Sequence, residues 1–251
     1  MNKYFRTIDQ RTKVQTDDLV IGRLSVLPFY HDTEIDIQAL GGTLINSYHQ
    51  HLYVANIKNW YHDLEDLTFK TYFDISKIPE GKYVLKGETN SKKELWRTHM
   101  FAESKKQVTD VLINLQNDSL VGRQQICARE YIPLKTHMIG LNGQPITEEF
   151  RFFFCYQQLV AGGYYWASHE EELKDANIIP DASKVPSSLL DEIAHRIGDK
   201  INFYVADIAQ TEAGDWILVE LNDACMSGCS SIQTDDLYRN LEIIVRNKWN
   251  Q

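Results

Sequence analysis

The sequence of 251 residues contains no uninterrupted run of about 18 apolar residues, the length that a membrane-spanning helix requires. Its start, MNKYFRTIDQ, lacks the apolar segment of a secretory signal, so we expect a cytoplasmic protein. Cysteine is scarce, with four residues, which in a chain of this length predicts free thiols in a reducing compartment. No Cys or His pair has zinc-finger spacing, and the triplet HQH at His49–His51 stands alone.

Basic residues are in the minority, with 26 Lys and Arg against 35 Asp and Glu, which gives a formal net charge of −9. We therefore expect neither nucleic acid nor a membrane surface as a partner. Hydrophobic residues at 43% and charged residues at 24% are ordinary for a globular protein, which excludes disordered, collagen-like and rod-like coiled-coil chains. At about 150 residues per domain, the chain forms one large domain or two small ones.

Hydrophobic periodicity predicts an α+β protein that opens with a small α/β layer and has mostly antiparallel strands in its second half. A turn around Ile78–Gly81 marks a domain boundary. The expected strands are Leu19–Leu27, Thr43–Asn46, Leu52–Ala55, Lys82–Lys86, Gln125–Ile132, Glu148–Leu159 and a hairpin over Asn202–Asn222. The expected helices are Thr33–Leu40, one that begins near Ser91, Val108–Leu115, Leu189–Ile197 with Ser187 and Ser188 as caps, and Leu237–Val245.

The hairpin, FYVADIAQTEAGDWILVELND, carries the most informative pattern. If Ala213 and Gly214 form a two-residue loop, Asp207 lies directly opposite Glu220, and Asn222 points to the same face. Two opposed carboxylates repel each other unless a cation neutralises them, and such oxygen ligands suit Mg²⁺ or Mn²⁺. The alternative is the exposed face of an edge hairpin.

Lysines follow an apolar strand in the run YVLKGETNSKK, in which Lys86 ends the strand. Ser91 and Glu94 have the spacing of a capping box, which predicts that a helix begins there. Lys92 and Lys93 then fall in its first turn, where the helix dipole disfavours cations unless an anion such as a triphosphate binds. A solvated surface turn is the alternative. The glycine-rich Walker A pattern is absent.

Two further segments have a structural and a functional interpretation. The run AREYIPL at Ala128–Leu134 is either a simple connection or a segment whose backbone binds the edge of an adenine. In the run EEFRFFF, Glu149 and Arg151 share one face of a strand. They form a structural ion pair, or Arg151 reaches a phosphate oxygen, which the planar guanidinium suits.

In this order, these segments resemble the ATP-grasp superfamily, and most of all a short, often phage-encoded clade with a small N-terminal domain. The run that begins at Asp207, DIAQTEAGDWILVELNDACMSG, is the most specific, since an acid, a hairpin and E-L-N resemble the magnesium site of that superfamily. The resemblance implies an ATP-grasp fold, in which two α+β lobes clasp a nucleotide. The small α/β domain would span residues 1–77, the small lobe 78–132 and the large lobe 133–251.

The resemblance also implies roles for residues of the small lobe. Lys86 would contact the α- and β-phosphates of ATP, and the loop with Ser91, Lys92 and Lys93 would cover the triphosphate. A second basic contact to ATP falls to either Lys92 or Arg129.

The adenine would bind the hinge formed by Glu130, Tyr131 and Ile132, and Arg151 would face the γ-phosphate. Lys86 and Arg151 are thus the expected catalytic cations. The implied Mg²⁺ ligands are Asp207, Glu220 and Asn222, with Mn²⁺ as an alternative ion.

The implied activity is an ATP-dependent carboxylate–amine ligase, which forms an acyl phosphate and releases ADP and phosphate. A phosphotransferase on the same scaffold and a non-catalytic ATP-binding module are the alternatives. The acceptor would be a small molecule, an amino acid or a peptide, and Arg23, Arg97 and His99 are candidates to bind it. The sequence does not define the oligomeric state.

Overall fold

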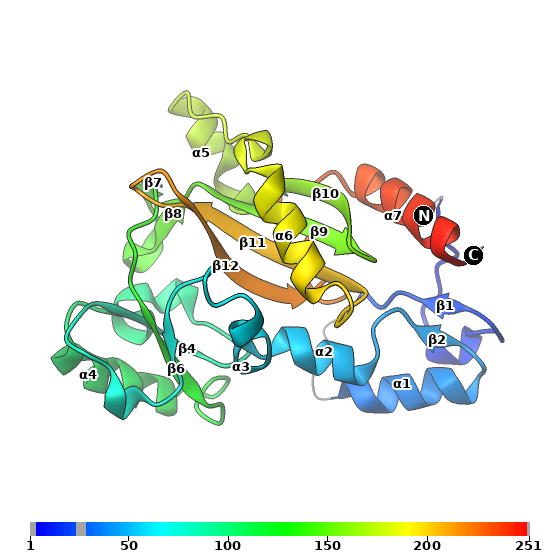
Figure 1. The fold of residues 1–251 in the computed structure, drawn as a ribbon, viewed down its shortest axis with the longest axis horizontal. Helices are drawn as coiled ribbons and strands as arrows, with labels where there is room; N and C mark the ends of the chain where they lie inside the picture. Colours follow the sequence, from blue (N-terminus) through cyan, green and yellow to red (C-terminus); the bar gives the residue numbers. More distant parts are fainter. Residues whose placement is uncertain (1–3, 24–28, 250–251) are drawn as a thin grey trace.

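The computed structural model describes residues 4–23 and 29–249 of the chain. Three regions are visible in Figure 1: an N-terminal layer, a small lobe around β4 and β6, and a large lobe around β9, β11 and β12. The mixture of helices and antiparallel sheets confirms the α+β prediction. All four cysteines are free thiols. None of the helices in the described part of the chain has the length and apolarity needed to cross a bilayer.

The N-terminal layer packs two helices against a short parallel strand pair. Its elements are β1 (Leu19–Val20), α1 (Tyr30–Ala39), β2 (Thr43–Leu44), α2 (Tyr48–Ala55) and α3 (Ile57–Trp60). Part of the strand predicted over Leu19–Leu27 lies outside the described residues. The strand predicted at Leu52–Ala55 is wrong, because this segment ends α2. A capping box between Ser47 and Gln50 begins that helix upstream of the apolar run.

The small lobe is an antiparallel sheet in the order β3-β6-β4-β5, with α4 packed on it. Its elements are β3 (Thr71–Tyr72), β4 (Tyr83–Gly87), β5 (Phe101–Ala102), α4 (Lys105–Gln116) and β6 (Ile126–Glu130). The periodicity of α4 is confirmed, since Val108, Val111 and Leu115 are buried. The helix predicted from Ser91 is wrong. A 3₁₀ turn, Lys93–Leu95, and a π-helical turn, Trp96–Met100, stand there, and no side chain caps them.

The large lobe is built on a second antiparallel sheet in the order β10-β9-β11-β12. Its elements are β7 (Thr136–Ile139), β8 (Pro145–Thr147), β9 (Glu149–Cys155), β10 (Gln158–Tyr164), α5 (Glu170–Asp175), α6 (Ser187–Ile197), β11 (Phe203–Gln210), β12 (Trp216–Asp223) and α7 (Thr234–Trp249). Figure 1 shows α6 crossing one face of the sheet. Residues of α7 pack with the alternate side chains of β9, so both faces are covered.

Two predictions for this lobe are wrong in detail. The strand expected over Glu148–Leu159 is a hairpin of β9 and β10, because Tyr156 and Gln157 take positive φ angles of 47° and 67° and reverse the chain. Neither Ser187 nor Ser188 caps α6, whose N-cap residue is Pro186. The apolar face predicted for α6 is buried.

The division into three parts at residues 77 and 132 stays a prediction. Before residue 77, β3 already pairs with β6 of the small lobe. The buried residues Val54, Ile57 and Trp60 belong to the core shared with α6. The segment between α2 and β3 therefore packs with both lobes rather than with the N-terminal layer alone.

Asn46 joins the N-terminal layer to the large lobe. Its fully buried amide donates to the Phe203 carbonyl (2.7 Å) and to Asp223 Oδ1 (2.9 Å), and its Oδ1 accepts from the Phe203 N–H (2.9 Å). Asn46→Ala leaves these buried groups unsatisfied, so we expect a loss of about 2–4 kcal/mol in the free energy of unfolding. Urea denaturation would measure it. The exposed Asn117→Ala serves as the control, and equal stability of both variants would contradict this role.

Candidate functional site

Three charged residues lie side by side across the large sheet. Arg151 of β9 is in register with Asp207 of β11, which is in register with Glu220 of β12. The Arg151 guanidinium binds the fully buried Asp207 carboxylate with two bonds, Nε to Oδ1 and Nη2 to Oδ2, each 2.8 Å long. Lys86, from β4 of the small lobe, donates to Glu220 Oε1. The two carboxylates are thus opposed, and each has a cation beside it.

A β-bulge at Val219 places Glu220 opposite Asp207. Below the bulge, Ile208 pairs with Leu218, and a regular ladder would then pair Asp207 with Val219. The extra residue shifts the register by one and turns Glu220 to the face of Asp207. The predicted pairing is therefore confirmed, but the predicted two-residue loop is wrong. The turn spans Thr211–Asp215, with the Thr211 N–H bound to the Asp215 carbonyl.

The carboxylates of this row are held in their charged forms. Burial alone would raise the pKa of Glu220, but the ammonium groups of Lys86 and Lys93 outweigh burial and lower this pKa to about 2. Burial would likewise lower the pKa of the Arg151 guanidinium, but the contact with Asp207 outweighs it and raises that pKa. The alternative pairing of Glu149 with Arg151 is not formed, because Arg151 binds Asp207 instead.

Lys93 connects the small lobe to the far edge of the same site. Its ammonium donates to the Tyr165 hydroxyl (2.9 Å) and lies 3.9 Å from Glu149 Oε1. Oε1 of Glu149 is buried and accepts no hydrogen bond from the described residues. Burial raises the pKa of this carboxyl, which Lys93 opposes. The Arg151 guanidinium lies over the ring of Tyr165, 4.8 Å from its centroid, so this ring adjoins both cations.

Arg129 ties the small lobe to the bulge. Its buried guanidinium donates to the Val219 carbonyl (2.7 Å) and to Thr68 Oγ1 (2.7 Å), and it lies over the ring of Phe69. Its Nε atom is buried and binds no acceptor in the described part of the chain. Burial lowers the pKa of this guanidinium. Arg129 is thus a cation with one donor left for an acceptor in the cavity described next.

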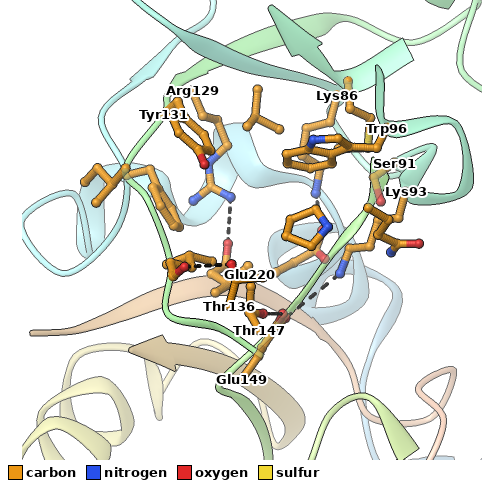
Figure 2. Close-up of a pocket in the computed structure, with 18 of the residues that line it drawn as sticks. Lys86, Ser91, Lys93, Trp96, Arg129, Tyr131, Thr136, Thr147, Glu149 and Glu220 are labelled. Carbon is orange, nitrogen blue, oxygen red and sulfur yellow. Dashed lines mark hydrogen bonds and ion pairs between the residues drawn. The ribbon is translucent and has the colours of Figure 1, made fainter. Parts of the chain in front are cut away.

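A largely apolar cavity of about 820 Å³ opens between the lobes, and we call it the apolar cavity. Figure 2 shows Lys86, Ser91 and Lys93 on one side of it and Glu220, Thr147 and Glu149 on the other. Its apolar walls include Val84, Met100, Tyr131, Ile132, Leu134 and Trp166. A volume of this size suits a planar ring system with a polar extension.

The predicted hinge residues Glu130, Tyr131 and Ile132 all line the apolar cavity. The N–H of Glu130 donates to the Lys70 carbonyl and that of Tyr131 to the Lys82 carbonyl. No acceptor within residues 4–23 and 29–249 binds the Ile132 N–H. This N–H, at the wall of an apolar cavity, is therefore free to donate to the edge of a heterocycle.

A second cavity of about 1000 Å³, which we call the polar cavity, adjoins the first. Its lining includes His51, Asn90, Arg151, Asn222, Asp223 and Ser227. Ser91, Lys93 and Glu220 line both cavities. The two cavities therefore meet at the charged row, where a ligand in one can react with a ligand in the other.

Several predicted residues lie elsewhere. Lys92 lines neither cavity, and its ammonium pairs with Glu94 (3.2 Å) and Asp118 (3.1 Å). Arg97 is exposed on the π-helical turn, and His99 contacts Thr98 on the same turn. Arg23 donates to the carbonyls of Ala224 and Ser227, so it braces the loop after β12. Of the two candidates for a second basic contact, only Arg129 lines a cavity.

Sequence reasoning missed His51, Asp223 and Tyr165 as residues of the site. His51 stood in an isolated triplet, and the contact that brings it to the site spans 172 residues of sequence. Asp223 follows Asn222 directly and could have been noted as a third acidic side chain of β12. Tyr165 follows β10 at a strand end that the single-strand prediction did not reach.

The donor set around the row fits a hard cation. Asp207, Glu220 and Asn222 offer two carboxylates and an amide oxygen, and the described residues contain no group of three His, Cys, Asp or Glu that could hold a metal. Two carboxylates without thiolate or imidazole ligands suit Mg²⁺, which fills its remaining positions with water and phosphate oxygens. The choice of these three ligands stays a prediction.

The model of one protein family matches most of the chain. It describes an ATP-grasp domain, the third family of its clade, and it covers residues 74–241. The matched range includes β4, β6 and the whole sheet that carries the charged row. A search of curated protein sequences finds no match.

Solved structures with little sequence identity share the fold. A RimK domain protein ATP-grasp from Sphaerobacter thermophilus has a TM-score of 0.55 at 12% identity, over 94% of this chain and 87% of that chain. D-cycloserine synthetase DcsG gives 0.56 at 8% identity, over 97% and 87%. The ATP-grasp ligase PsnB, complexed with minimal precursor, Mg and ADP, gives 0.52 at 10% identity, over 86% of this chain and 66% of that chain. This chain thus spans just under two thirds of PsnB.

The lowered pKa of Glu220 predicts how stability depends on pH. Its folded-state pKa of about 2 lies below the ordinary 4.5, so its contribution is complete above about pH 5 and is lost as the pH falls towards 2. In metal-free buffer, wild type should therefore lose on the order of 2–3 kcal/mol more than Glu220→Gln across this range. Denaturant unfolding at several pH values would measure the difference.

The control is Glu80→Gln, which removes the same charge at an exposed position. Parallel pH profiles for wild type and Glu220→Gln would show that the ion pair with Lys86 does not stabilise the fold.

Proposed function

Since the chain belongs to this ATP-grasp domain family, we propose that it is an ATP-dependent ligase that joins a carboxylate to an amine or a related nucleophile. The reaction would pass through an acyl phosphate and release ADP and phosphate. The observation that carries this proposal is the junction of the two cavities at Ser91, Lys93 and Glu220. A nucleotide in the apolar cavity would place its γ-phosphate beside an acceptor in the polar cavity.

The nucleotide would bind through the groups that the apolar cavity leaves free. The Ile132 N–H would donate to the adenine edge, and Val84, Met100 and Leu134 would contact the ring. Lys86 and Lys93, which bind carboxylates in this structure, would turn to the phosphates. Asp207, Glu220 and Asn222 would hold Mg²⁺, which supplies charge neutralisation for the polyphosphate. The presence of Mg and ADP in the PsnB structure supports this proposal.

The chemistry needs charge and position more than a protein nucleophile. A substrate carboxylate in the polar cavity would attack the γ-phosphorus of ATP, and the bond to the β–γ bridging oxygen would break to give an acyl phosphate and ADP. Arg151 lines this cavity and would stabilise the charge on the transferred phosphoryl group. The amine would then attack the acyl carbon, and inorganic phosphate would leave.

The two alternatives lack this support. A phosphotransferase would need a base for its acceptor hydroxyl, and the sequence has no H-R-D run. A non-catalytic module would be free to lose Lys86, Asp207, Glu220 or Asn222, and all four are present. We propose an amino acid, a peptide or another small molecule as the substrate, because the polar cavity is lined by hydrogen-bonding and charged side chains.

Lys86 provides a test of nucleotide binding. Lys86→Met keeps the length of the apolar stem but removes a cation beside the phosphates, so the affinity for Mg-ATP should fall roughly 10- to 100-fold, as expected for a charge-assisted hydrogen bond of about 1.5–3 kcal/mol. Thermal-shift titration would measure it. Lys92→Met is the matched control, because Lys92 pairs with Glu94 and Asp118 outside both cavities. A larger loss of affinity in the control would return the phosphate contact to Lys92.

The products test the reaction class. With a pool of amino acids and dipeptides, we expect ADP and phosphate together with a product lighter than its two parts by one water, detected by mass spectrometry. Hydroxylamine should intercept the acyl phosphate and give a hydroxamate. AMP and pyrophosphate would indicate adenylation and refute the proposal, whereas a stable phosphorylated product would favour the phosphotransferase.

A further inference from the structure

We infer that His51 accepts the proton of the attacking amine in the polar cavity, with Asp223 as its positioning residue. This inference rests on the proposed function, because it concerns the second half of the ligase reaction. His51 lies on α2 of the N-terminal layer, before the segment that the family model matches. It lines the polar cavity together with Arg151 and Asn222, and it does not line the apolar cavity.

The imidazole of His51 is held rigidly. Its Nδ1 lies 3.0 Å from Asp223 Oδ2, and its ring stacks on that of Tyr30 at 4.2 Å with an interplanar angle of 7°. The other carboxylate oxygen of Asp223 accepts from the Asn46 amide and from the Cys225 N–H, both at 2.9 Å. The orientation of the ring is therefore set from both sides.

These bonds decide which ring nitrogen can act as a base. The Asp223 carboxylate accepts hydrogen bonds, so the proton of the neutral ring resides on Nδ1 and the lone pair on Nε2. No hydrogen bond to Nε2 is formed by the described residues, and Nε2 is not among the fully buried atoms that lack a partner. Since His51 lines the polar cavity, Nε2 opens onto it.

A purely structural role would not require this arrangement. Asn46 already joins the N-terminal layer to Phe203 and Asp223 through three hydrogen bonds. The charged groups that share the cavity with His51 are Lys93, Glu94, Arg151, Glu220 and Asp223. Of these, Arg151, Lys93 and Glu220 face the phosphoryl end of the site, which leaves the His51 side for the nucleophile.

The chemistry calls for a base at this place. An α-amine, with an ordinary pKa of about 7.7–8.0, or a lysine amine, at about 10.4, is largely protonated at neutral pH and has no lone pair to attack with. His51 Nε2 would take one proton from the ammonium group, and the amine nitrogen would then form a bond to the acyl carbon. The bond from that carbon to the phosphate oxygen breaks, and phosphate leaves with the electron pair and with the second proton of the nitrogen. The third proton stays on the amide, and the imidazolium returns its proton to water.

Hydroxylamine separates this role from all others, because it is uncharged at neutral pH and attacks without a base. The test variant is His51→Asn, whose side-chain amide can still donate to Asp223 while Nε2 is lost. We expect amide formation from amino acids and dipeptides to fall by about 100-fold or more, while hydroxamate formation with hydroxylamine stays within about threefold of wild type. Stabilisation by Mg-ATP in a thermal shift should be unchanged.

The matched control is His49→Asn, which makes the same substitution at an exposed position of the same helix. Asp223→Asn should reproduce the selective loss of amide formation, because an amide at this position favours the wrong tautomer of the ring.

Each other outcome overturns the inference. Equal loss of hydroxamate and amide in a folded His51→Asn protein would show a structural role, and full retention of both would show no role. Wild type that forms hydroxamate but no amide from this pool would mean that the acceptor is not such an amine. Wild type that forms neither product would refute the proposed ligase itself, which distinguishes the two failures.

Discussion

The repulsion between Asp207 and Glu220 is the constraint on which the site depends. Their strands hold the two carboxylates in register, so each needs a positive partner to remain ionised where it is. Arg151 supplies one from the same sheet and Lys86 supplies the other from the opposite lobe. The bond between Lys86 and Glu220 therefore does two things at once: it neutralises the row and it joins the two lobes.

The sequence predicted the parts of this site that depend on local pattern. Alternation along the hairpin placed Asp207 opposite Glu220, and helical spacing identified α4 and α6. The pairing was right although the assumed loop was wrong, because the longer turn and the bulge at Val219 shift the register in opposite directions. A bulge leaves no clear signal in composition, so this compensation is visible only in the structure.

The errors have a common physical cause, which is that capping and tertiary contacts override propensity. Leu52–Ala55 is apolar enough for a strand, but the capping box at Ser47 commits it to a helix. Ser91 has the spacing of a capping box, yet the lysine two residues on is drawn across the cleft to Tyr165 and Glu149, and no regular helix forms. His51 was missed because its partner, Asp223, is distant in the sequence.

The resident ion pairs also decide in what form a nucleotide can enter. ATP alone would draw Lys86 and Lys93 towards its phosphates and leave Asp207 and Glu220 facing each other without a full set of counter-charges. A divalent ion alone would satisfy the carboxylates and strand the lysines in a buried setting. When both arrive together, each exchanges places with a resident charge and the local balance is kept. The site thus favours the magnesium complex over either component, and metal and nucleotide bind cooperatively without any further movement of the protein.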